Sequence, residues 1–399
     1  MGSRPSIFQM TVLRTIKLGY EEKARSYEIA IGEGLLEYCG NWVRETIPSA
    51  RKLAVVSNPT VYGIYGEKVT VSLDEAGFDV SFFLMPDGEE FKNLEVAEKI
   101  LNHLNENGIS REDAVVALGG GVVGDIAGFA ASIHLRGISF MQIPTTLLAM
   151  VDSSVGGKTG VNSGFGKNLI GSFHQPAGVL ADVATLATLD PREIAAGMYE
   201  AVKQAALAGK EELGRLGDFL RANDVSSVPS LVSDATRSGE LCGLLAEQVS
   251  FKASVVGGDA RESTARTDGL SRKILNFGHT TAHALEKCAG YGALRHGEAV
   301  GYGMLVAGEL SKRLEICSSD SIDLLNDVVR TVGVLPGTGN ISVDDVLDAI
   351  ELDKKSGGGS VQWILLEDIG KPLIVSGQDI QPKPIRESIE HVISRKTAD

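Results

Sequence analysis

The chain is poor in cysteine, and its few cysteines do not form a motif. Four occur in 399 residues, at Cys39, Cys242, Cys288 and Cys317, and none is part of a CxxC pair. This argues against a zinc site built from thiolates and favours reduced thiols. The opening residues, MGSRPSIFQM, also lack the apolar segment of a secretory signal. We therefore expect a cytoplasmic location.

Long apolar runs are missing as well. The most apolar stretch, residues 114–133, contains five glycines and Asp125. A membrane-spanning helix would place that carboxylate in hydrocarbon at a cost of about 3 kcal/mol. We interpret the stretch as a buried strand, a turn and a helix, and expect no contact with a membrane.

Basic residues are outnumbered. The chain has 38 Lys and Arg against 52 Asp and Glu, which gives a net charge of -14. A nucleic-acid-binding protein needs a dense basic surface, so this class is disfavoured. A phosphorylated small molecule is not excluded, because a few lysines can gather locally in an acidic protein.

The pattern of apolar residues divides the chain near residue 188. Before it, short apolar runs alternate with helical patterns, which is typical of an α/β domain with a mainly parallel sheet. Strands are expected at 26–31, 52–57, 80–84, 114–118 and 140–143, and helices at 61–75 and 93–107. After it, helical patterns dominate, beginning with an N-cap at Asp190 followed by Pro191. Further helices are expected at 318–332, 342–352 and 383–395, and a strand pair at 361–366 and 372–375. We predict domains at 1–188 and 189–399.

Two glycine-dense segments lie in the first half. GGGVVG at residues 119–124 fits the G-x-G-x-x-G template between a strand and a helix, where backbone amides can approach a pyrophosphate. A simple tight turn explains it equally well. The second segment, residues 155–168, carries Lys158, Lys167 and Asn168 among five glycines. It indicates a loop for an anionic ligand, with a solvated surface loop as the alternative.

Histidines cluster in the second half. His279 and His283 are four residues apart, on one helical face, and His296 follows soon after. With the upstream Glu200, these residues offer the imidazole and carboxylate ligands of a catalytic zinc site. Spacing alone does not decide which histidines bind metal, and unrelated helix and loop histidines remain the alternative.

Taken in order, these segments resemble 3-dehydroquinate synthases, within the wider sugar phosphate cyclase group. The resemblance covers about residues 58–355. Its blocks are GGGVVGD (119–125), LRGISFMQIPTTLLAMVDSSVGGKTGVN (135–162), GKNLIG (166–171), EAVKQA (200–205), KASVV (252–256), LNFGHTTAHALE (275–286) and HGEAVGYG (296–303). The family has an N-terminal nucleotide-binding α/β domain and a mainly α-helical metal-binding domain, which agrees with the division above.

The resemblance implies a set of site residues. The metal, Zn2+ or alternatively Co2+, would be held by Glu200, His279 and His296. The sugar phosphate substrate would be contacted by Asp152, Lys158, Asn168, Lys203, Lys252, Arg272, Asn276, His283, Lys354 and Lys355. NAD would be bound by Asn58, Glu89, Lys92, Gly119, Gly120, Gly121, Asp125, Thr145, Thr146 and Lys167. Arg136 resembles the residue that family members supply across the interface of a homodimer.

The implied reaction converts 3-deoxy-arabino-heptulosonate 7-phosphate to 3-dehydroquinate and phosphate, with transient oxidation by NAD. Some positions depart from the family pattern: extra residues at 263–268, Thr281-Ala282, and Gly301-Tyr302. They keep open a sister cyclase that makes a valiolone, an inosose or an amino-dehydroquinate. Arg272 is favoured over Arg266 as the substrate arginine, and a buried guanidinium suits a substrate carboxylate. A metal-dependent alcohol or glycerol-phosphate dehydrogenase and a non-catalytic NAD-binding protein are more distant alternatives.

Overall fold

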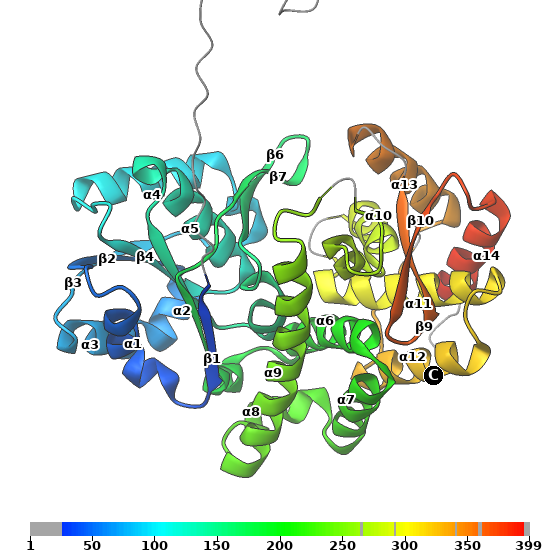
Figure 1. Ribbon diagram of the computed structural model, residues 1–399, viewed down its shortest axis with the longest axis horizontal. Coiled ribbons are helices and arrows are strands. Elements are labelled where there is room, and N and C mark those ends of the chain that lie inside the picture. The colour runs from blue at the N-terminus through cyan, green and yellow to red at the C-terminus, as the bar shows by residue number, and fades with distance from the viewer. Residues whose placement is uncertain (1–25, 264–265, 291–292, 340, 358–360, 395–399) are drawn as a thin grey trace, which may run out of the picture.

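The computed structural model describes residues 26–263, 266–290, 293–339, 341–357 and 361–394. An α/β half at the left of Figure 1 adjoins a mainly helical half at the right, and the long helix α9 (Ala235–Gly258) stands between them. This is the predicted fold class, an α/β part followed by a mainly α-helical part, and it is confirmed. The boundary at residue 188 stays a prediction, because the core of the helical half also includes Leu147, Met150 and Val183.

The α/β half is built on a parallel sheet that contains six strands among the described residues. All of its pairings are parallel. In spatial order the strands are β1 (Glu28–Gly32), β8 (Gly178–Asp182), β5 (Ser139–Pro144), β4 (Ala114–Gly119), β2 (Lys52–Ser57) and β3 (Asp79–Leu84). The predicted strand at residues 52–57 has the predicted bounds, and β8 was not predicted.

Both faces of the sheet are covered because alternate residues of each central strand point to opposite sides. Leu53 and Val55 of β2 pack in one core with α1 (Cys39–Thr46) and α3 (Glu67–Glu75). Ala54 and Val56 pack in the other with α4 (Leu94–Glu106) and α5 (Gly121–Ile133). The short helix α2 (Pro59–Val61) and a wider turn at Tyr62–Gly66 lead into α3, so the predicted helix at 61–75 is continuous.

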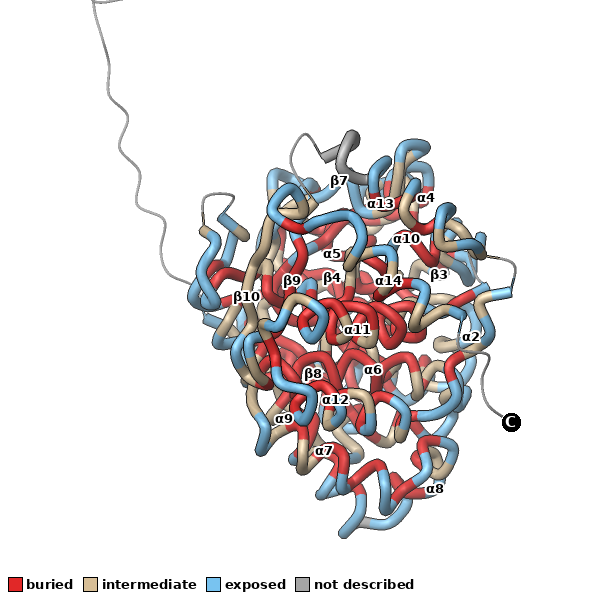
Figure 2. Tube along the Cα trace, turned by 90° about the vertical axis from the view of Figure 1, so that its right-hand side faces the viewer, coloured by how far each residue is buried: buried red, intermediate tan, exposed pale blue. Residues whose placement is uncertain are grey.

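The helical half surrounds α6 and α11, which form the buried centre in Figure 2. Asp190 caps α6 by accepting from the backbone N–H of Arg192, with Pro191 as its first residue, as the sequence predicted. The helices of this half are α6 (Pro191–Ala208), α7 (Lys210–Ala222), α8 (Val228–Leu231), α9, α10 (His279–Ala289), α11 (His296–Arg313), α12 (Ser319–Val332), α13 (Val343–Gly357) and α14 (Pro382–Ile393). The expected strand pair is β9 (Gln362–Asp368) and β10 (Lys371–Ser376), and it is antiparallel.

The glycine-dense segment at 155–168 is not a loop. It forms a two-stranded antiparallel hairpin with β6 (Lys158–Ser163) and β7 (Gly166–Phe173). Glycine is required by packing here, because a Cβ at Gly171 would lie 2.3 Å from the backbone oxygen of Thr159. Glycines therefore serve close strand approach here, and they made the segment look like a loop.

Helices α6, α10 and α11 approach one another through glycines. A Cβ at Gly297 of α11 would lie 1.9 Å from the carbonyl oxygen of Ala196 in α6. A Cβ at Gly303 would lie equally close, 1.9 Å, to the carbonyl oxygen of Gly278, which caps α10 with φ +79°. The first contact brings the first turn of α11 against α6, and the second brings the start of α10 against α11. None of the helices in the described part of the chain combines the length and hydropathy that a membrane crossing requires.

The contact between Gly303 and Gly278 gives a stability prediction. We expect Gly303→Ala to lower the free energy of unfolding by about 3 kcal/mol, since backbone on both sides prevents the added methyl group from fitting. Gly243→Ala is the control: it also lies inside a helix, α9, but its Cβ meets nothing within 4 Å. Urea denaturation of both variants measures the difference, and equal unfolding midpoints would contradict the packing described.

Candidate active site

Three polar side chains from different helices meet where α6, α10 and α11 pack together. Glu200 lies in the middle of α6, and His279 and His296 are the first residues of α10 and α11. Nε2 of His279 is 3.8 Å from Oε1 of Glu200, and Nε2 of His296 is 3.5 Å from the same oxygen. One ligand atom from each residue lies within 4.8 Å of the other two. The structure thus brings together the three residues predicted to bind metal.

An ion pair between Arg192 and Glu298 fixes the start of α11, at His296. The guanidinium of Arg192 in α6 donates to both oxygens of Glu298, from Nε at 2.5 Å and from Nη2 at 2.8 Å. Glu298 also accepts from the backbone N–H of Arg295, the N-cap of α11. This bidentate pair ties the start of α11 to α6 and so sets His296 beside Glu200.

The donor set fits a divalent cation. Both carboxylate oxygens of Glu200 are buried, and they face the Lys203 ammonium and the imidazoles of His279 and His296. Burial acts to raise the pKa of Glu200, but the Lys203 ammonium, 2.5 Å from Oε2, together with the imidazoles of His296 and His279, outweighs burial and the pKa falls to about 2. A buried carboxylate that is ionised and only partly neutralised favours a further positive charge. Two imidazoles and one carboxylate are also the ligand types of catalytic zinc sites.

His279 is oriented as a ligand. Its Nδ1 lies 3.2 Å from the carbonyl oxygen of Phe277, which can only accept, so Nδ1 carries the proton and Nε2 keeps a lone pair. Burial, with the nearby Lys203 ammonium, holds the pKa of His279 well below its usual value. The imidazole is therefore neutral, the state that a metal ligand requires.

Three charged residues predicted to contact substrate form a network next to Glu200. Nζ of Lys252 donates to the Asp152 side chain at 2.7 Å, and Nζ of Lys203 lies 3.7 Å from the same oxygen. Burial acts to raise the pKa of Asp152, but the two ammonium groups outweigh it and hold the pKa far below its usual range. Burial acts to lower the pKa of Lys203, and the carboxylates of Glu200 and Asp152 outweigh it, so this pKa is raised. Asp152 and Lys203 therefore stay charged beside the ligand cluster, whereas burial lowers the pKa of Lys252.

Arg272, another predicted substrate residue, lies near the network of Asp152, Lys203 and Lys252. It is buried, donates to the carbonyl oxygen of Ala260 at 3.0 Å, and its guanidinium lies 5.7 Å from the ring centre of Phe173 on the hairpin. A Cβ at Gly156 would lie 2.5 Å from its Nη2, and Gly156 has φ +102°, so only glycine fits there. Arg266, the alternative arginine, instead pairs with Asp268.

The other predicted substrate residues are more dispersed. Lys158 forms an ion pair with Glu262. The Asn168 side chain accepts from Nζ of Lys92 at 2.6 Å. Asn276 and His283 are exposed, and the His283 ring centre lies 5.4 Å from that of His279. Lys354 and Lys355 fall in α13, but their side chains lie outside the described residues.

The predicted nucleotide residues lie at the end of the sheet where its parallel strands terminate. Asn58 follows β2, the glycines 119–121 follow β4, and Thr145 and Thr146 follow β5. Strand order reverses between β2 and β4, because the chain moves outward to β3 and then returns. Ligands of open parallel sheets bind at the carboxyl ends of strands at such a point.

Charged groups complete this edge. Lys92 pairs with Asp125 at 2.5 Å, and the Asn162 side chain donates to Glu89 at 2.7 Å. Arg136 instead lies on the turn before β5, exposed and with φ 70°. This turn is at the opposite edge of the sheet, so Arg136 does not join the nucleotide residues of its own chain.

Sequence reasoning missed two acidic residues in this region. Glu262 pairs with Lys158, and Glu286 accepts from Lys167 at 3.0 Å and lies 3.2 Å from Nδ1 of His296. Glu286 stands three residues after His283, inside the block LNFGHTTAHALE, so a helical i, i+3 reading could have found it.

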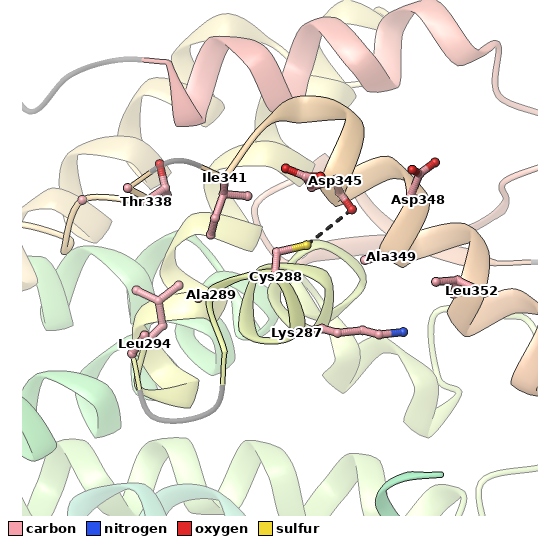
Figure 3. Close-up of a pocket in the computed structure, with 13 residues that line it drawn as sticks. Lys287, Cys288, Ala289, Leu294, Thr338, Ile341, Asp345, Asp348, Ala349 and Leu352 are labelled. Carbon is pink, nitrogen blue, oxygen red and sulfur yellow. Dashed lines mark hydrogen bonds between the residues drawn. The ribbon is translucent and has the colours of Figure 1, made fainter.

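A separate cavity of about 620 Å³ lies between α10, α13 and the loop before α13. Figure 3 shows Cys288 between Leu294 and Asp345, with its thiol donating to the carbonyl oxygen of Asp345 at 3.4 Å. The wall contains none of the predicted site residues, so this cavity is not the site described above.

Comparison with known proteins agrees with this architecture. Residues 82–196 match the family model "3-dehydroquinate synthase N-terminal", and residues 197–356 match "3-dehydroquinate synthase C-terminal". A 3-dehydroquinate synthase from Nostoc punctiforme is 40% identical over 364 residues, which cover 90% of this chain and 95% of the relative.

Solved structures show the same relationship. One is 2-epi-5-epi-valiolone synthase from Streptomyces hygroscopicus subsp. jinggangensis with NAD+ and Zn2+ bound, similar with a TM-score of 0.79 and 28% identity over 95% of this chain and all of that one. Another is a 2-deoxy-scyllo-inosose synthase with carbaglucose-6-phosphate, NAD+ and Co2+, with a TM-score of 0.75 and 26% identity over 91% of this chain and 96% of that one. The recognition made from the sequence is confirmed, and the chain belongs to the 3-dehydroquinate synthase family.

Proposed function

We propose that this chain converts 3-deoxy-arabino-heptulosonate 7-phosphate to 3-dehydroquinate and phosphate, using NAD and a divalent metal ion. The observation that carries the proposal is the contact between two groups of residues. Glu200, one of the three candidate metal ligands, shares Lys203 with the Asp152–Lys252 pair. A metal-bound sugar hydroxyl and an anionic substrate group could therefore be held side by side.

Each set of residues has a distinct task in this proposal. A cation held by Glu200, His279 and His296 would act as a Lewis acid on substrate hydroxyls, and NAD would remove one hydride and later return it. The carboxyl ends of β2, β4 and β5 would hold the nucleotide. Asp152, Lys203 and Lys252 would orient the substrate and neutralise charge, because their side chains are held together beside the ligand cluster.

The substrate carboxylate would bind Arg272. This guanidinium is planar and buried, and Gly156 leaves space beside its Nη2. Such a group prefers a bidentate anion. The carboxylate distinguishes heptulosonate from the sugar phosphates that give a valiolone or an inosose, which lack one, but not from the precursor of an amino-dehydroquinate.

Packing explains Gly301 and Tyr302, two of the residues that depart from the family pattern. A Cβ at Gly301 would lie 2.9 Å from the ring of Tyr199 in α6, so glycine is needed for helix contact. Tyr302 donates to the carbonyl oxygen of Pro336 at 2.7 Å, and Thr281 is buried. These residues therefore give little support to a different substrate.

A homodimer and a cytoplasmic location complete the proposal. Arg136 lies exposed beside Ile133 and Leu135, two exposed apolar residues that would suit an interface with a second copy. The four cysteines are free, as expected in a reducing compartment. Sedimentation of the purified protein tests the dimer.

A coupled assay tests the reaction. Purified protein with the heptulosonate phosphate, NAD+ and Zn2+ should release one phosphate per substrate, without accumulation of NADH, since the hydride is returned. NADH that accumulates in proportion to substrate would favour a dehydrogenase instead. Turnover of sedoheptulose 7-phosphate but not of the heptulosonate would favour a sister cyclase.

Two variants separate metal binding from substrate binding. His279→Ala should remove both bound metal and activity, because it deletes one of three ligands. Lys158→Ala should reduce activity by about 100-fold or more and leave the metal content unchanged, since its ammonium pairs with Glu262 rather than with the ligands. Metal analysis of both dialysed variants and the wild type decides, and equal metal in His279→Ala would refute the ligand assignment.

A further inference from the structure

Glu286 connects the two halves of the molecule at the candidate metal ligands. It lies on α10 and is buried, and its two oxygens have different partners. Oε1 accepts from Nζ of Lys167 at 3.0 Å, and Oε2 lies 3.2 Å from Nδ1 of His296. Lys167 comes from β7 of the hairpin, whereas His296 begins α11.

The two nitrogens of His296 face two different carboxylates. Nδ1 faces Glu286, and Nε2 faces Glu200 at 3.5 Å. An ionised carboxylate only accepts hydrogen bonds, so the contact with Glu286 requires a proton on Nδ1. With Nδ1 committed to Glu286, a metal can be bound only through Nε2, the nitrogen that faces Glu200 and the candidate site shared with His279. A carboxylate that holds the far nitrogen of a histidine ligand in this way both fixes the ring and strengthens the ligand.

A second metal site is a competing explanation, because His283, Glu286 and His296 also lie close enough to hold an ion. The contacts of Glu286 argue against it. One oxygen is occupied by the Lys167 ammonium, which would repel a cation, and the other takes the proton of His296. His296 cannot offer Nδ1 to a metal while that nitrogen donates. We therefore interpret His283 and Glu286 as residues that surround the candidate metal site of Glu200, His279 and His296, and not as ligands of a second ion.

Through Lys167, Glu286 is also connected to the nucleotide-binding half. Its neighbour on the hairpin, Asn168, accepts from Lys92, and Lys92 pairs with Asp125 at the start of α5. In Figure 1 the hairpin β6–β7 lies at the top, between α5 and α10. A chain of polar contacts thus runs from the nucleotide edge of the sheet through the hairpin to His296.

We propose that Glu286 is a positioning residue that holds His296 with Nε2 toward the metal, and that Lys167 supports Glu286 from the nucleotide-binding half. The inference rests on the metal site proposed above. It implies that replacing Glu286 with a neutral residue weakens metal binding although no direct ligand is lost. Removing the Lys167 ammonium should have a smaller effect in the same direction.

The affinity for Co2+ in the absence of NAD tests this directly. Competition with a chromophoric chelator should show affinity about 10–100-fold weaker for Glu286→Gln than for wild type, the usual effect of losing such a partner. Lys167→Met should weaken it less, and the double variant should match Glu286→Gln, because Lys167 acts through Glu286. The visible absorption of bound Co2+ should change in Glu286→Gln, since it reports ligand geometry.

Glu309→Gln is the matched control. Glu309 is a largely buried glutamate of α11 that pairs with Arg313, so its loss should leave both affinity and spectrum unchanged. Affinity and spectrum of Glu286→Gln equal to those of wild type would overturn the inference. If that variant does not fold, Lys167→Met decides alone: weaker Co2+ binding supports the inference and unchanged binding overturns it. A wild-type protein that binds no Co2+ or Zn2+ would instead refute the proposed metal site itself.

Discussion

The arrangement depends on one buried carboxylate. Glu200 lies at the centre of the helical half with both oxygens out of contact with water. A charge in that position must be compensated, since a lone buried carboxylate is costly. Lys203 supplies part of the compensation, and the open side faces His279 and His296. A cation at this point would remove the remaining imbalance, which explains why three helices are packed so tightly around it.

The two halves contribute different parts of the same chemistry. The parallel sheet provides strand ends where a nucleotide can bind, and the helices provide the ligand cluster. Side chains from both halves meet at several places, among them Asp152 with Lys203 and Lys252, Lys167 with Glu286, and Lys158 with Glu262. A hydride carrier and a metal-bound substrate could face one another only if these contacts keep the halves in register.

Much of this was predictable from the sequence, because local signals agreed with the fold. The continuous apolar run KLAVVS predicted a buried strand, and Asp190 with Pro191 predicted the start of α6. The family blocks then identified residues that periodicity could not rank. Glu200, for example, is one acidic residue in an amphipathic pattern until tertiary structure brings His279 and His296 to it.

Other features could not be predicted for physical reasons. Glycines suggested a loop at 155–168, whereas the segment enters a hairpin whose strands pack so closely that a Cβ at Gly160 or Gly171 would meet the opposite backbone. Strand β8 is only five residues long, and its place between β1 and β5 depends on pairings distant in sequence. The spacing of Glu286 to His283 was visible in the sequence, but its contacts with Lys167 and His296, which come from other elements, depend on the fold.

X-ray absorption at the zinc edge tests the central claim most directly. For protein loaded with one equivalent of Zn2+, the account predicts imidazole nitrogens from two histidines and oxygen ligands, all at about 2.0–2.2 Å. It also predicts the outer-ring scattering typical of coordinated histidine. A sulfur ligand at about 2.3 Å, or a shell of oxygens without imidazole, would contradict it.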